Sequence, residues 1–173
     1  MDLDLQDRGV LVTGGSGGMG RAIVRAYAAE GARVTLTYVS DEEAASSIVK
    51  EVESGGGSAA AVPMDLTDHS SIERAVSEAA SRHGGLDVLV ANAVRWPTDA
   101  AGPLAESDPV VWQTALRANL EGTAATVRAA WPLLAQLRST CRPRPRSTRP
   151  SWRCSSSGAG RCPAMRPSTS LPS

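Results

Sequence analysis

Five glycines fall within eight residues near the start of the chain, in the run Thr13-Gly14-Gly15-Ser16-Gly17-Gly18-Met19-Gly20. Glycine permits a tight turn and lets backbone amides approach a phosphate closely. The positive end of a following helix then meets the negative charge. A surface turn can also be rich in glycine. Here the run lies between an apolar strand-like segment and a helical one, so it predicts a pyrophosphate-binding loop.

The elements around this loop follow a regular order. Short apolar runs alternate with longer helical runs through the first 138 residues, which predicts an α/β fold of Rossmann type with a doubly wound parallel sheet. Strands are expected at residues 10–12, 34–39, 59–64 and 86–91, and the later strands of such a sheet are missing. Helices are expected at about residues 19–30, 40–54, 67–83 and 108–137, the last one mildly broken near Asn119 and Gly122. We expect His69 and His83, at the two ends of one helix, to lie on the surface.

Charge divides the chain into two parts. The whole chain holds 18 basic and 18 acidic residues, but residues 139–173 carry seven arginines, nine serines, six prolines and no acid. The first 138 residues therefore hold 11 basic and 18 acidic groups, a net charge of −7. We expect one incomplete dinucleotide-binding domain over residues 1–138 and a disordered tail over residues 139–173.

Composition also excludes several classes of protein. An acidic body with a single lysine, Lys50, is unsuited to nucleic acid, which requires clustered positive charge. No apolar run approaches the roughly 18 residues of a membrane span, and the start lacks the basic region of a secretory signal, so a cytoplasmic location is expected. All three cysteines lie in the tail with no histidine beside them, so no metal site is predicted.

The spacing of Thr13, Gly14, Gly18 and Gly20 resembles the Thr-Gly-x-x-x-Gly-x-Gly motif of the short-chain dehydrogenase/reductase family. The segment Tyr38-Val39-Ser40 is most similar to the 3-oxoacyl-acyl-carrier-protein reductase branch. The resemblance covers residues 1 to about 138.

Three further positions support the resemblance. Asp65 matches the family's adenine-contacting aspartate after the third strand. Asn92 with Ala93 matches its Asn-Ala motif after the fourth strand, although Val94 stands where the family usually has glycine. Asn119 matches the asparagine that holds a catalytic water or lysine through its helix. Each also has a plain alternative: Asp65 as a loop acid, Asn92 as a turn residue and Asn119 as a helix kink.

The resemblance implies a dinucleotide site with Asn119 as a catalytic residue. The predicted cofactor-binding residues are Thr13, Gly14, Ser16, Gly18, Met19, Gly20, Tyr38, Ser40, Asp65, Leu66, Asn92 and Ala93.

The end of the second strand bears on which dinucleotide binds. Tyr38 occupies the position where NAD-binding folds place an acid on the ribose 2′-hydroxyl. Without that acid a 2′-phosphate is not repelled, and Ser40 can donate to it, so NADP is expected. NAD stays open, because Gly17 and Val39 replace the basic residues that family members often use for the phosphate.

The family's reaction is hydride transfer between nicotinamide and a carbonyl or hydroxyl carbon, here expected on a 3-oxoacyl thioester or a polyketide-like ketone. It requires a tyrosine, a lysine four residues later, and a serine after the fifth strand. The only tyrosines are Tyr27 and Tyr38 and the only lysine is Lys50, so this pair is absent and the chain as written is expected to be inactive. We hypothesise that residues 139–173 are a frame-shifted or otherwise altered ending of a longer reductase.

An alternative is a non-catalytic nucleotide-binding or dimerisation protein. Residues 108–137 are apolar on more than one helical face, which indicates a homo-oligomer formed through this helix.

Overall fold

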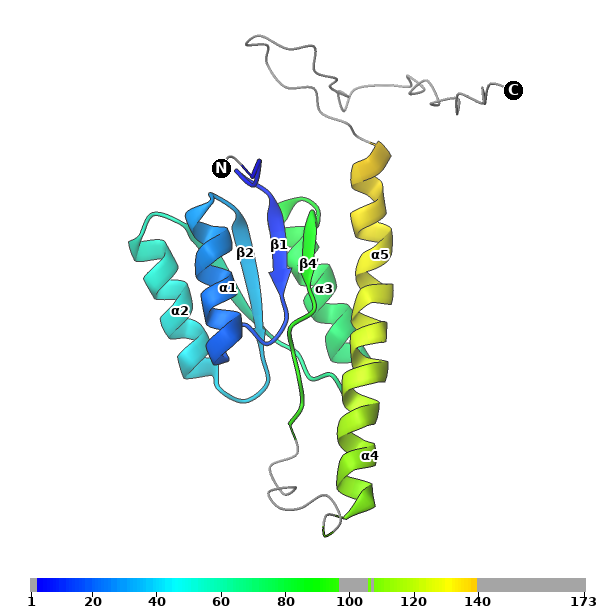
Figure 1. Cartoon of the computed structure of the whole chain (residues 1–173). Helices are drawn as coiled ribbons and strands as arrows, with labels where there is room; N and C mark the ends of the chain where they lie inside the picture. The colour runs from blue at the N-terminus through cyan, green and yellow to red at the C-terminus, as the bar shows by residue number, and fades with distance from the viewer. Residues whose placement is uncertain (1–2, 97–105, 107, 140–173) are drawn as a thin grey trace, which may run out of the picture.

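Four parallel strands form a single sheet in the order β3-β2-β1-β4 (Figure 1). The strands are β1 (Gly9–Val12), β2 (Arg33–Tyr38), β3 (Ser58–Pro63) and β4 (Val88–Val90). The computed structural model describes residues 3–96, 106 and 108–139, and the predicted tail lies outside these residues except for Ser139. The Rossmann-type α/β fold is therefore confirmed over the described body.

Helices cover both faces of the sheet (Figure 1). The helices α1 (Gly18–Ala29) and α2 (Glu42–Ser54) pack on one face, and α3 (His69–His83) and α5 (Thr123–Ser139) pack on the other. The side chains of β1 alternate between these layers: Val10 and Val12 join the α1–α2 core, and Leu11 joins the α3–α5 core. Val10, Leu11 and Val12 are all fully buried, so the strand is apolar on both faces of the sheet.

The predicted strands are confirmed with shifts of one residue, except for β4, which is shorter than residues 86–91. Leu86 is fully buried before the strand begins, and the Asp87 amide donates to the Gly9 carbonyl at 2.8 Å. Residue 87 therefore still bonds to β1, but the regular pairing of the two strands begins at Val10 and Val88. The three β4 residues are half-buried, although β4 is an edge of the described sheet.

The predicted break near Asn119 and Gly122 is a change of helix type. α4 (Pro109–Arg117) is followed without interruption by a π-helical segment, η3 (Ala118–Gly122), and then by α5. Asp108 caps α4 by accepting from the Val110 amide at 2.8 Å. In Figure 1 α4 extends past the carboxyl ends of the strands, so it flanks the edge at which the glycine loop lies.

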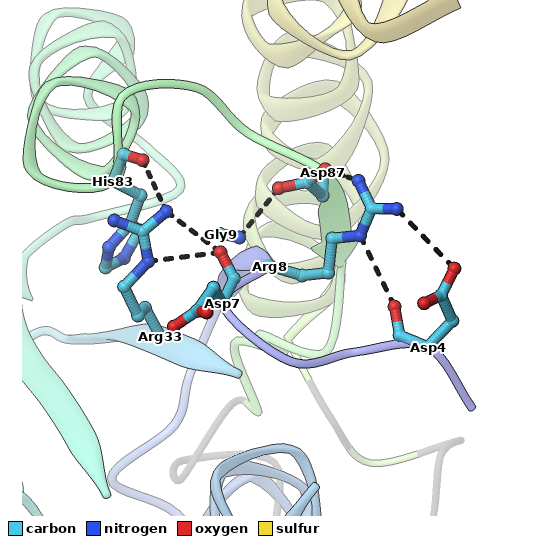
Figure 2. Close-up of polar contacts among 7 residues, drawn as sticks. All are labelled: Asp4, Asp7, Arg8, Gly9, Arg33, His83 and Asp87. Atoms are coloured by element: carbon cyan, nitrogen blue, oxygen red, sulfur yellow. Dashed lines mark hydrogen bonds and ion pairs between the residues drawn. The ribbon is translucent and has the colours of Figure 1, made fainter. Parts of the chain in front are cut away.

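The amino edge of the sheet carries a polar network, shown in Figure 2. Asp87 holds β1 through two bonds, one from the Gly9 amide at 2.8 Å and one from Arg8 Nη1 at 2.9 Å. Arg33 donates to the carbonyl oxygens of Asp7 and His83, at 2.9 Å and 2.7 Å from Nη2. This network ties the start of β1 and β2 to the end of α3.

His83 is only 8% exposed, so the prediction that it lies on the surface is wrong, whereas His69 is exposed as expected. His83 Nε2 lies 2.8 Å from the hydroxyl oxygen of Thr35, a fully buried residue of β2. The last turn of α3 faces the sheet at this point, and helical spacing in the sequence did not reveal that contact. Burial lowers the pKa of His83 below its ordinary value of 6.5, and the positive charges of Arg33 and Arg82 lower it further, while Asp87 opposes them.

We therefore expect His83 to make folding depend on pH. The unfolded chain takes up a proton near pH 6.5 but the folded protein does so only at lower pH, so stability is full above about pH 6.5 and falls as the pH decreases below it. His83→Gln removes this titration and should flatten the fall, measured by urea unfolding between about pH 7.5 and pH 5. His69→Gln, at the exposed end of the same helix, should keep the wild-type slope. Equal slopes for the wild type and His83→Gln would contradict the assignment.

Candidate nucleotide-binding site

The first turn of α1 differs from those of the other helices along the carboxyl edge. Aspartates cap α2, α3 and α4: the side chains of Asp41, Asp68 and Asp108 each accept a backbone amide hydrogen bond. The N-cap of α1 is Gly17, which has no side-chain cap, and no acid lies in the first turn. The amides of this turn are therefore available to an anion, and the helix dipole favours negative charge there.

Three glycines of the loop have distinct steric roles. Gly14 has φ of +64°, and a Cβ there would lie 2.9 Å from the Cα of Ala93. A Cβ on Gly20 would overlap the carbonyl oxygen of Gly14, so α1 packs directly on the loop. A Cβ on Gly18 would meet nothing within 4 Å. The space beside Gly18 is open, where a ligand can approach the backbone.

Thr13 supports the loop from beneath. It is 2% exposed, and its hydroxyl oxygen accepts the amides of Asn92 at 3.0 Å and Ala93 at 2.9 Å. The same hydroxyl donates to the carbonyl of Val90 at 3.3 Å. Thr13 does not line the cleft, so its predicted role in binding is indirect: it joins the end of β1 to the end of β4.

Asn92 closes the same junction from the other side. Its amide nitrogen Nδ2 donates to the carbonyls of Thr13 at 3.0 Å and Gly14 at 3.3 Å. On β2, Thr37 accepts the amide of Gly14 through its hydroxyl at 3.0 Å and that of Gly15 through its carbonyl at 2.9 Å. The glycine loop is thus bonded to both neighbouring strands of β1.

These residues open into a cleft of about 790 Å³ at the carboxyl edge of the sheet. Eleven of the twelve predicted cofactor-binding residues line it, all except Thr13. The lining also includes residues that are not among these twelve, namely Gly17, Thr37, Val39, Asp41, Met64, Val94, Arg95, Trp96, Val110, Val111, Thr114 and Ala115. Four of these occupy one face of α4 at helical spacing. That spacing predicts a common face, but only the tertiary structure shows that it meets the cleft.

Two strand ends supply polar groups to the cleft. Asp65 accepts the amide and the hydroxyl of Thr67 at 2.8 Å each, which shapes the turn after β3. At the end of β2, burial raises the pKa of Tyr38, and the negative charge of Glu42 adds to this. Ser40 is exposed beside it.

Asn119 is not among the cleft-lining residues. Its Oδ1 accepts the Arg95 amide at 2.7 Å, and its Nδ2 donates to the Arg95 carbonyl at 3.0 Å. This reciprocal pair joins η3 to the segment after β4, across 24 residues of sequence. Trp96, next to Arg95, packs edge-on against Trp112 of α4, with ring centroids 6.1 Å apart.

Among residues 3–96, 106 and 108–139, no group of three His, Cys, Asp or Glu side chains could hold a metal ion. In the same part of the chain, no helix combines the length and the apolar character needed to span a bilayer.

A family model described as short chain dehydrogenase matches residues 8–140. The chain belongs to the short-chain dehydrogenase/reductase family. Among curated relatives, 3beta-hydroxysteroid dehydrogenase 1 of Eggerthella lenta is 37% identical over 127 residues, covering 73% of this chain and 48% of that protein. The 3-oxoacyl-acyl-carrier-protein reductase FabG of Staphylococcus aureus is 30% identical, covering 76% of this chain and 52% of that protein. A crystal structure of a short chain dehydrogenase from Burkholderia cenocepacia in complex with NADP is 36% identical, with a TM-score of 0.69, covering 75% of this chain and 52% of that one.

The chain spans about half the length of the family members it matches. The two tyrosines and the single lysine of the chain lie on three different elements. Tyr27 is on α1, Tyr38 ends β2, and Lys50 is exposed on α2. Tyr38 and Lys50 are twelve residues apart, so they do not form the family's Tyr-x-x-x-Lys pattern.

We expect the Thr13 hydroxyl to be essential to the junction between the strand ends. Thr13→Val keeps the shape but removes the acceptor of the Ala93 amide and one of the two acceptors of the Asn92 amide, at a cost of about 1–3 kcal/mol in the free energy of unfolding. Thr13→Ser keeps the hydroxyl and should stay much closer to the wild type. Urea unfolding of the three proteins measures the difference, and equal stability of the Val and Ser variants would refute this role.

Proposed function

We propose that this chain binds NADP in the cleft at the carboxyl edge, as the dinucleotide-binding half of a short-chain oxidoreductase. The observation that carries the proposal is the uncapped, glycine-lined first turn of α1, which opens into a cleft lined from all four strand ends. Phosphate groups bind such helix N-termini through free amides and the helix dipole. Every other helix beginning along this edge in the described chain already has an aspartate cap.

The residues present fit a dinucleotide. The open space beside Gly18 and the first-turn amides suit a pyrophosphate, and Asp65 with Leu66 would hold the adenine end, by resemblance to the family. Tyr38 and Ser40 would lie at the adenosine ribose. Asn92 and Ala93 would border the cofactor on the opposite side of the loop.

NADP is favoured over NAD by the residues at the end of β2. In NAD-binding folds, an acidic residue at the position of Tyr38 binds the 2′-hydroxyl of the ribose, and this chain has no carboxylate at that position. The hydroxyl of Ser40 is exposed in the cleft. The nearest acid along the chain, Asp41, lines the cleft, but its Oδ1 accepts the Ala44 amide at 2.8 Å as the cap of α2. A family member of similar fold holds NADP in its crystal structure, which supports the same choice.

For the oxidoreductase of which this chain would form the dinucleotide-binding half, we propose hydride transfer between nicotinamide and a carbonyl or hydroxyl carbon of a 3-oxoacyl thioester or polyketide-like ketone. NADPH would supply the hydride in the reductive direction, and a protein group would have to supply the proton to the carbonyl oxygen. In this chain Tyr38 is the only tyrosine that lines the cleft, and its pKa is raised rather than lowered, which is the wrong direction for proton transfer at neutral pH. We therefore propose that the chain as it stands binds the dinucleotide without turning it over, and that Asn119 positions the rim of the cleft.

Titration of intrinsic and NADPH fluorescence tests the binding site. The wild type should bind NADPH more tightly than NADH. Gly18→Asp should weaken NADPH binding about tenfold or more, because its carboxylate enters open space beside the first-turn amides and repels the pyrophosphate. Gly18→Asn is the matched control, since it has the same size without the charge and should lose much less.

Two results would contradict the proposal. Equal affinity of the Gly18→Asp and Gly18→Asn variants for NADPH would show that the pyrophosphate does not bind at the first turn of α1. Oxidation of NADPH by this chain with a 3-oxoacyl thioester would show that a proton donor other than the family's tyrosine is present.

We further propose that the chain forms homo-oligomers through residues 108–137. Four large apolar side chains on α4, η3 and α5 are exposed and lie outside the cleft lining, namely Leu116, Leu120, Val127 and Trp131, with Trp131 at 65%. Several exposed large apolar side chains on one continuous helical segment favour a contact with another protein.

Size-exclusion chromatography with light scattering tests this interface. Trp131→Glu should shift the wild-type oligomer towards monomer, because a buried unpaired charge opposes association. Ser47→Glu introduces the same charge at an exposed position of α2, outside residues 108–137, and should leave the oligomer intact. A monomeric wild type, or an oligomer unaffected by Trp131→Glu, would count against this surface.

A further inference from the structure

Two separate rims of the cleft meet the same short segment of helix. The turn after β3 contributes Asp65 and Leu66 to the cleft, and the segment after β4 contributes Arg95 and Trp96. The π-helical segment η3 contacts both rims, although none of its own residues lines the cleft. The contacts come from Gly122 and Asn119.

Gly122 packs directly against the backbone of Leu66. A Cβ at position 122 would overlap the carbonyl oxygen of Leu66 and lie 2.7 Å from its Cβ. Gly122 is buried, and its own carbonyl accepts the hydroxyl of Thr126, itself 1% exposed, at 2.8 Å. Gly122 is therefore hydrogen-bonded to α5 through its carbonyl and packs against the turn after β3.

Asn119 holds the other rim. Its side chain forms two hydrogen bonds with the backbone of Arg95, at 2.7 Å and 3.0 Å, so this segment is fixed in both position and orientation. In an α-helix, residues three apart lie on the same face. The wider π turn, with its i→i+5 bonding, separates their directions and lets Asn119 and Gly122 reach different rims.

We propose that η3 is the spacer that sets the distance between the two rims, with Gly122 as the positioning residue for the turn at Asp65 and Leu66. Asn119 is its counterpart for the segment at Arg95. The inference rests on the proposed nucleotide site, because it assigns the affinity for the dinucleotide to the width of that cleft. Neither residue needs to touch the ligand for this role.

The main test is Gly122→Ala in the full chain. The added methyl pushes the turn at Leu66 away, so the affinity for NADPH and for adenosine 2′,5′-bisphosphate should both fall about tenfold or more. Hydrogen exchange of the Asp65 and Thr67 amides, which are bonded to Ser71 and Asp65, should speed up without ligand, while that of β1 stays unchanged.

Gly57→Ala is the matched control. A Cβ there would lie 2.9 Å from Val52 Cγ1, so it also crowds a packed contact, but at the turn before β3 and away from the cleft lining. Its stability should fall while its affinity for NADPH stays within about twofold of the wild type. A loss of affinity in both variants would mean that the Gly122 effect is only general destabilisation.

Folded Gly122→Ala with wild-type affinity and wild-type exchange at Asp65 and Thr67 would overturn the proposal. If Gly122→Ala does not fold, Asn119→Ala tests the other rim: faster exchange of the Arg95 amide together with weaker NADPH binding supports the spacer, and unchanged values overturn it. Failure of the wild type to bind NADPH would refute the proposed function instead. The exchange measurements without ligand would still decide whether η3 positions the two rims.

Discussion

The hydroxyl of Thr13 is the interaction on which the site depends. It is buried where β1 ends, and it accepts the amides of Asn92 and Ala93 while donating to the carbonyl of Val90. The side chain of Asn92 returns bonds to the carbonyls of Thr13 and Gly14. Because parallel strands end at one edge, this single junction fixes the glycine loop relative to β4 and aims the first turn of α1 into the cleft.

The two edges of the sheet are built in opposite ways. At the amino edge, Arg33 donates to the carbonyls of Asp7 and His83, and Asp87 accepts from the Gly9 amide and the Arg8 side chain, so these polar groups have partners within the chain (Figure 2). At the carboxyl edge, the first turn of α1 has neither cap nor acid. The residues of this turn, Gly17 to Met19, are exposed, so their amides are accessible to an anion in the cleft.

Much of this arrangement was predictable from local patterns. The strand at β1, the turn of glycines between it and α1, and the helix α3 follow from the spacing of apolar residues and glycines, and the structure confirms these elements. Contacts between distant segments were not predictable. The burial of His83 depends on Thr35, 48 residues away, and the bonds of Asn119 depend on Arg95, 24 residues away. Neither partner leaves a periodic signal in the sequence, because each contact involves a single side chain.

By itself, the sequence determined the class of fold and the position of the glycine loop between a strand and a helix, since strand and helix periods and glycine's steric freedom are local properties of the chain. It also determined that no Tyr-x-x-x-Lys pair is present in these 173 residues. Only the tertiary structure decided that α4 walls the cleft, that Thr13 supports rather than lines it, and that η3 joins its two rims. Those features depend on contacts between side chains that are far apart in the sequence. The packing of the helices on the sheet determines which of these side chains come into contact.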